Sequence, residues 1–165
     1  MKSETIILIG MAGVGKSTIG KLLAKALNFH FTDLDLLINK KIGKSPQEII
    51  DEEGEKILLL TEKQTMNSVN LQHQVVAPGG SIIYHPGLMS RLKQKVTFIY
   101  LQDSYKNIKQ REEKRNTGGV IGMKSKSFKE IFEERKPLYL KYADIVIDVS
   151  NKKPEEVVKE IRRLI

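Results

Sequence analysis

A glycine-rich segment near the N-terminus holds the residues best suited to chemistry. It reads GMAGVGKS from residue 10 to residue 17, with Thr18 next, and fits the pattern G-x-x-x-x-G-K-[ST]. In such loops backbone N–H groups surround phosphate oxygens, the lysine reaches the β- and γ-phosphates, and the hydroxyl binds Mg²⁺. An apolar run precedes the loop and an amphipathic run follows it, which disfavours a chance glycine-rich turn. The prediction is a site for ATP and Mg²⁺ formed by Gly13, Val14, Gly15, Lys16, Ser17 and Thr18.

A pair of carboxylates, Asp33 and Asp35, directly follows a second short apolar run. Residues two apart at the end of a strand point the same way, so we expect both carboxylates to face a cleft. Phosphoryl transfer to a hydroxyl group needs one carboxylate near the metal and a group that orients the hydroxyl. The alternative is that one aspartate only caps the helix expected to begin at Leu36.

Apolar runs and amphipathic stretches alternate along the whole chain. Short β-rich runs predict strands at residues 5–9, 29–32, 75–77, 96–101 and 145–149, and helical periodicity predicts helices at 16–27, 35–41, 45–53, 55–69, 104–113, 127–142 and 154–164. This alternation is typical of parallel strands joined by right-handed crossovers. The expected structure is a single α/β domain over residues 1–165. It has a three-layer P-loop NTPase-type fold, with a five-stranded parallel sheet, helices on both faces and ligands at the carboxyl ends of the strands.

Two segments, 78–87 and 116–127, lack the pattern of a core element and are rich in small or polar residues. In a three-layer enzyme such segments are candidates for substrate loops and lids. We expect a mobile lid at about residues 111–127.

Composition sets limits on the class of protein. The chain has 165 residues, a net charge of +8 and no cysteine, so disulfides and thiolate metal sites are excluded. It lacks the ~20-residue apolar run of a membrane span and the apolar region of a signal peptide, so a cytoplasmic monomer without a membrane partner is expected. The positive charge attracts anions without naming them. Since no recognition helix or aromatic-basic surface is evident, we expect no nucleic-acid partner.

The order of several motifs resembles that of the shikimate kinase family. The phosphate loop is followed by F-x-D-x-D from Phe31, by Gly54-Glu55, by the Gly79-Gly80 turn and by R-x-P-L-Y from Arg135. The resemblance covers nearly the whole chain and is most specific where F-x-D-x-D and R-x-P-L-Y occur together. It implies an ATP-dependent kinase of aromatic amino acid biosynthesis that converts shikimate to shikimate 3-phosphate.

The resemblance also implies a role for individual residues. Asp33 would lie near Mg²⁺ and the transferring phosphoryl group, and Asp35 would bind and activate the acceptor hydroxyl. Gly79 and Gly80 would offer backbone contacts to the acceptor, and Arg135 would pair with its carboxylate. Arg115 would reach the transferring phosphate, and Arg111 would lie against the adenine. From the residues alone, Arg135 could equally be a surface charge.

The acceptor side departs from the family pattern. Leu59 stands where shikimate kinases have an arginine that binds the acceptor carboxylate, and Ser81 stands at the family's third glycine. Lys56 or Lys63 could replace that arginine, although an ammonium group does not reproduce its fork. The alternatives are therefore a kinase for another small hydroxy acid or amino alcohol, or a regulatory nucleotide-binding module. An intact Lys16, Ser17 and Asp33 disfavour the regulatory module.

Overall fold

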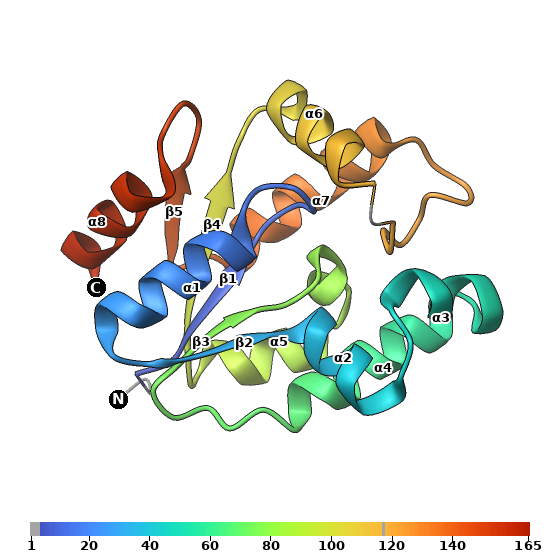
Figure 1. Ribbon diagram of the computed structural model, residues 1–165, viewed down its shortest axis with the longest axis horizontal. Coiled ribbons are helices and arrows are strands. Elements are labelled where there is room, and N and C mark those ends of the chain that lie inside the picture. The colour runs from blue at the N-terminus through green and yellow to red at the C-terminus, as the bar shows by residue number, and fades with distance from the viewer. Residues whose placement is uncertain (1–3, 117) are drawn as a thin grey trace.

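The computed structural model describes residues 4–116 and 118–165, in which strands and helices alternate (Figure 1). The elements in chain order are β1 (Ile6–Ile9), α1 (Lys16–Leu27), β2 (His30–Asp33), α2 (Leu34–Ile42), α3 (Pro46–Glu53), α4 (Glu55–Asn67), β3 (Gln74–Ala77), the 3₁₀ helix η1 (Gly80–Tyr84), α5 (Pro86–Lys93), β4 (Thr97–Gln102), α6 (Tyr105–Arg115), α7 (Phe128–Tyr142), β5 (Ile145–Asp148) and α8 (Pro154–Leu164).

The five strands form one parallel sheet in the order β2-β3-β1-β4-β5, as the sequence predicts. β1 lies at its centre, where Ile7 is in register with Val76 of β3 and Phe98 of β4. All four residues of β1 are buried, as expected for a parallel sheet that is covered on both faces.

Helices cover both faces of the sheet, which confirms the three-layer prediction. α1 and α8 pack against each other on one face, and α5 and α7 lie on the other (Figure 1). Because all five strands are parallel, the loops after β1, β2 and β3 lie at the same edge of the sheet.

The segment 78–87 differs from its prediction as a loop without a core role. It contains η1, in which Ile82 and Ile83 are buried, and it leads into α5, which buries Leu88 and Met89. The 3₁₀ helix has five residues and α5 has eight, so neither is long enough to show a helical period in the sequence. Among the described residues of this segment, only the first four, Pro78, Gly79, Gly80 and Ser81, line a cavity.

Among the described residues, no helix combines the length and the apolar character needed to cross a lipid bilayer.

Candidate active site

A cavity of about 740 Å³ opens where β1, β2 and β3 end. The residues that line it come from the phosphate loop, the start of α2, α4, the turn after β3, α6, the segment after α6, and α7. They include Ala12, Gly13, Gly15, Lys16, Ser17, Thr18, Asp33, Asp35, Glu62, Gly79, Gly80, Ser81, Arg111, Glu112, Arg115, Gly118, Gly119 and Arg135. The structure therefore brings together every predicted site residue except Val14.

The phosphate loop turns sharply between β1 and α1. Gly13 and Gly15 have φ angles of 84° and 104°, a left-handed region that favours glycine. At Gly10 a Cβ atom would lie 2.7 Å from the carbonyl oxygen of Leu101, so the loop passes too close to β4 for a side chain. Val14 is buried and packs into the core, which anchors the loop from beneath.

Lys16 begins α1, and its Nζ atom donates to the carbonyl oxygens of Gly10 and Met11 at 2.7 and 2.9 Å. Burial lowers the pKa of Lys16 to about 8, and the attraction of Asp35 opposes this shift. The ammonium group therefore lies inside the phosphate loop, in the space that an incoming phosphate would occupy. An anion there would stabilise its charged form.

Asp33 has a separate role for each of its oxygens. Oδ2 accepts a hydrogen bond from the Ser17 hydroxyl at 2.5 Å, and Oδ1 accepts from the backbone N–H groups of Asp35 and Leu36. Asp33 therefore caps α2, as the alternative interpretation expects, and also faces the phosphate loop through Ser17. The carboxylate and hydroxyl oxygens lie side by side, which suits a hard cation such as Mg²⁺.

Asp35 reaches the cavity from the first turn of α2, because β2 ends at Asp33. The expectation that the two aspartates share one face of a strand was therefore wrong, although both line the cavity. Burial, together with the negative charges of Glu62 and Asp33, raises the pKa of Asp35 to about 6. A carboxylate with a raised pKa in a cavity is suited to accept a proton from a hydroxyl group.

Glu62 is the main site residue that the sequence analysis missed. It is 2% exposed, and its Oε1 atom accepts a hydrogen bond from the Ser81 hydroxyl at 2.6 Å. Its Oε2 atom has no hydrogen-bond partner among the described residues, and His85 Nε2 lies 3.9 Å away. The signal lay in the spacing of α4, where Glu62 falls on the buried stripe with Leu58 and Thr65.

Arg135 is buried inside α7, so the interpretation of it as a surface charge was wrong. Its Nη2 atom donates to the carbonyl oxygen of Ile121 at 2.9 Å, and Nε donates to the Tyr84 hydroxyl at 3.3 Å. The guanidinium also lies over the Tyr84 ring, with Arg135 Cζ 5.2 Å from the ring centroid. The Tyr84 hydroxyl in turn donates a hydrogen bond to Glu134. These contacts hold a fixed positive charge in the cavity, beside Gly80.

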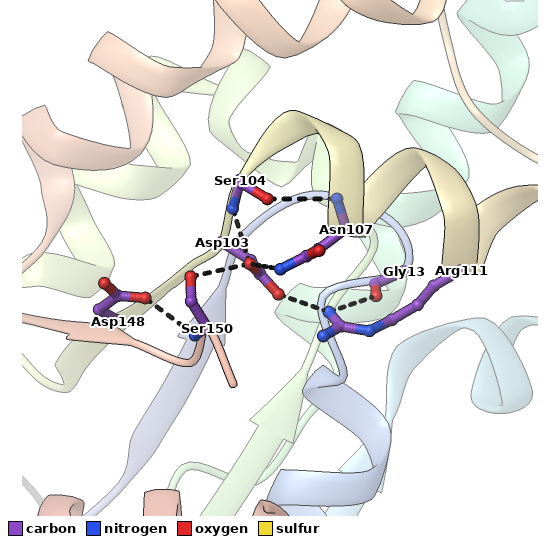
Figure 2. Close-up of polar contacts among 7 residues, drawn as sticks. All are labelled: Gly13, Asp103, Ser104, Asn107, Arg111, Asp148 and Ser150. Atoms are coloured by element: carbon purple, nitrogen blue, oxygen red, sulfur yellow. Dashed lines mark hydrogen bonds and ion pairs between the residues drawn. The ribbon is translucent and has the colours of Figure 1, made fainter. Parts of the chain in front are cut away.

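Two further arginines reach the cavity from α6. Arg111 pairs with Asp103 at 2.8 Å and donates to the carbonyl oxygen of Gly13 at 3.5 Å (Figure 2). Arg115 lies one turn further along, 3.9 Å from the Glu112 carboxylate, with about half of its side chain exposed. Both line the cavity.

The segment after α6 lines the cavity and is hydrogen-bonded to α3 and α4. Gly119 N–H donates to Gln47 of α3 at 2.6 Å, and Gly122 N–H donates to Glu55 of α4 at 2.8 Å. Gly118, Gly119 and Val120 of the segment predicted as a lid line the cavity, whereas Thr117 is outside the described residues.

Comparison with known proteins matches this chain to one family. A family model described as "Shikimate kinase" matches residues 12–165. A shikimate kinase of Caldanaerobacter subterraneus subsp. tengcongensis is 34% identical over 163 residues, which cover 97% of this chain and 95% of that protein. The chain belongs to the shikimate kinase family.

Solved structures agree with this placement in the shikimate kinase family. A shikimate kinase from Acinetobacter baumannii in complex with shikimate superposes with a TM-score of 0.87 and 28% sequence identity, covering 97% of this chain and 91% of that one. The shikimate kinase of Aquifex aeolicus gives a TM-score of 0.81 at 30% identity and covers 97% of this chain and 94% of that one.

The two departures from the family pattern, Leu59 and Ser81, lie in different surroundings. Leu59 packs against the hydrophobic core. Lys56 and Lys63 are exposed and do not line the cavity, so neither replaces the family arginine there. Ser81, by contrast, is buried and lines the cavity with its hydroxyl on Glu62.

Proposed function

We propose that this chain transfers the γ-phosphoryl group of ATP to a hydroxyl group of shikimate. The observation that carries the proposal is one continuous cavity with two chemically different ends. The phosphate loop with Lys16 and Ser17 forms one end, and Asp35 with Arg135 forms the other. Family membership and the likeness to a shikimate-bound relative support the choice of acceptor.

The transfer follows from the positions of these groups. The acceptor oxygen attacks the γ-phosphorus, the bond from that phosphorus to the β–γ bridging oxygen breaks, and ADP leaves with the electron pair. Asp35 orients the attacking hydroxyl and takes its proton. Lys16 and Arg115 oppose the negative charge that spreads over the transferring group. Arg135 pairs with the acceptor carboxylate.

The residues near the phosphate loop fit a magnesium ion. Ser17 and Asp33 place two oxygens next to the loop, and Mg²⁺ is commonly held by one or two protein oxygens together with phosphates and water. Among the described residues no cluster of three or more His, Cys, Asp or Glu side chains suits a metal, so a protein-only cage is not what this site offers. Bound there, the ion would neutralise charge on the β- and γ-phosphates.

We also propose that residues 111–127 act as the lid of this single domain. The segment crosses the cavity and its glycines carry bonds to Gln47 and Glu55. A closed lid excludes water, which would otherwise compete with the acceptor for the γ-phosphoryl group.

The test is ADP release by the purified protein with Mg·ATP, with and without shikimate. We expect saturable stimulation by shikimate and its loss in Asp35→Asn, with ADP binding retained in that variant. ADP release that shikimate does not stimulate, in a protein that binds ADP, would contradict the acceptor. Failure to bind ADP would contradict the nucleotide site itself.

A second acceptor class is favoured by the Ser81–Glu62 pair. Glu62 lines the cavity beside Ser81, and its Oε2 atom has no hydrogen-bond partner among the described residues, so a carboxylate oxygen is available there to a ligand. Compared with shikimate, this end would better suit a small hydroxy acid that does not need the family arginine, or an amino alcohol whose cation pairs with Glu62. A panel of such acceptors in the same ADP-release assay distinguishes them from shikimate.

A further inference from the structure

A buried carboxylate outside the cavity, Asp103, accepts three hydrogen bonds and forms an ion pair with Arg111 (Figure 2). It stands between β4 and α6 and is 4% exposed. Its Oδ1 atom accepts from Ser104 N–H at 2.7 Å, from Asn107 Nδ2 at 2.8 Å and from the Ser150 hydroxyl at 2.9 Å. Its Oδ2 atom faces Arg111 Nη1 at 2.8 Å. One side chain thus accounts for the placement of all four groups.

These contacts join three segments that are far apart in the sequence. Ser104, Asn107 and Arg111 lie at the start of α6 and on its next two turns, so Asp103 is bonded along that helix. Ser150 belongs to the loop between β5 and α8. Arg111 continues to the phosphate loop, where it donates to the carbonyl oxygen of Gly13. Asp103 therefore links α6, the β5–α8 loop and the phosphate loop.

The phosphate loop and α6 are also in direct contact. A Cβ atom on Gly13 would lie 3.2 Å from the carbonyl oxygen of Ile108 and 3.4 Å from the backbone nitrogen of Glu112. A shift of α6 would therefore press on the loop or leave it unsupported. The position of this helix is part of the geometry of the nucleotide end.

The Asp103–Arg111 pair is asymmetric in its exposure. The carboxylate side chain is fully buried, while 42% of the Arg111 side chain is exposed and lines the cavity. Burial alone would raise the pKa of Asp103, but hydrogen bonds from Asn107, Ser150 and Ser104 together with Arg111 outweigh it and lower that pKa. The carboxylate is thus charged at neutral pH. The Asp103 carboxylate binds the Arg111 guanidinium on its buried side, and the exposed side of the guanidinium faces the cavity.

We propose that Asp103 is a positioning residue for the nucleotide, which presets Arg111 beside the phosphate loop before a nucleoside phosphate enters. This inference rests on the proposed function in one respect, namely that the cavity binds a nucleotide. Asp103 does not touch the ligand and acts through Arg111. A pre-set arginine loses less conformational freedom on binding than a free one, so its loss weakens affinity without changing the reacting groups.

The first test compares Asp103→Asn with Asp148→Asn. The control changes a nearby aspartate that accepts from Ser150 N–H at 2.8 Å and does not contact Arg111 (Figure 2). We expect the dissociation constant of ADP, measured by calorimetry, and the KM for ATP to rise roughly tenfold in Asp103→Asn, the effect of losing one charge-assisted hydrogen bond. The KM for the acceptor and the values of the control variant should stay unchanged. An equal rise of both KM values would show a purely structural role and overturn the proposal.

A double-mutant cycle with Arg111→Gln makes the test independent of the acceptor. If Asp103 acts through Arg111, Asp103→Asn weakens ADP binding in the wild-type background and adds little once Arg111 is replaced. Additive losses would overturn the proposal. If Asp103→Asn fails to fold, Ser150→Ala enters the same cycle, because it removes one bond to the same carboxylate. Wild-type protein that binds no ADP would instead overturn the proposed function.

Discussion

Asp35 and Glu62 place two carboxylates around one small space beside Gly79. A Cβ atom at Gly79 would lie 2.9 Å from Glu62 Oε1 and 3.5 Å from Asp35 Oδ1. The negative charge of Glu62, this close and partly removed from water, disfavours the ionisation of Asp35. The protonation of Asp35 is therefore set by its neighbour as well as by its own burial. This arrangement connects the rebuilt acceptor end to the pH dependence of the reaction.

Glu62→Gln should move the acid limb of the kcat/KM profile to lower pH. The pKa of Asp35 is raised to about 6 by burial and then by Glu62, so kcat/KM falls as the pH drops through that value and Asp35 takes up a proton. Removing the charge of Glu62 lowers this pKa, and a shift of about half a unit changes the ionised fraction roughly threefold at pH 5. The exposed Glu133→Gln is the control. An acid limb that does not move would show that Glu62 leaves Asp35 unaffected.

Nucleotide binding should be accompanied by proton uptake near Lys16. Burial lowers the pKa of Lys16 to about 8, and a bound phosphate raises it again, so at pH 8.5 the free protein takes up protons when ADP binds. Calorimetry of ADP binding in buffers of different ionisation enthalpy measures this uptake. We expect a fraction of a proton per site for the wild type and less for Lys16→Met. Equal uptake in both proteins would assign the proton to another group.

Most elements could be predicted because each is amphipathic or apolar over its whole length. α1 and α8 have the predicted bounds, and the other predicted helices and all strands differ by one or two residues at their ends. The short η1 and α5 could not be predicted, because they are placed by the burial of Ile82, Ile83 and Met89 against the sheet. Periodicity does not report such tertiary contacts.

The site was predictable where a motif dictates local geometry and less so elsewhere. The phosphate loop and the acidic pair lie next to the strands that position them, so their place followed from sequence order. Glu62 and Asp103 reach their partners Ser81 and Ser150 across long stretches of chain. Those pairings depend on how α4 and α6 pack, and this packing could not be predicted from the sequence alone.

The segment that crosses the cavity is expected to open more readily when one of its anchors is removed. Glu55 Oε1 accepts the N–H of Gly122, so Glu55→Ala removes one bond between α4 and the segment after α6. We expect amide exchange of peptides covering residues 118–122 to become several-fold faster, in line with a loss of about 1 kcal/mol. Glu53→Ala is the control, since Glu53 pairs with Lys44. Unchanged exchange in Glu55→Ala would show that other contacts hold the segment closed.

At the scale of the whole molecule, an apolar core supports a site whose charged groups, Lys16 and Asp35, lower the free energy of unfolding. The core of the sheet is apolar and buried, whereas the cavity at its edge holds Lys16 and Asp35 with pKa values moved towards their neutral forms. Such shifts mean that ionising these groups costs stability in the folded state. The fold therefore holds these groups in place at the expense of some unfolding free energy, as is common where charged groups are needed for catalysis.

Asp35→Asn should therefore stabilise the protein at neutral pH while it abolishes transfer. Because the folded-state pKa of Asp35 is raised to about 6, its contribution to stability is greatest below the unfolded pKa and is lost as the pH rises through about 6. Removing the carboxylate should raise the unfolding free energy by about 1–3 kcal/mol at pH 7 and by less than about 1 kcal/mol at pH 4.5. Urea unfolding at the two pH values measures the difference, with the exposed Asp51→Asn as control. A variant that is less stable than wild type at pH 7 would show that hydrogen bonds of Asp35 outweigh the cost of its charge.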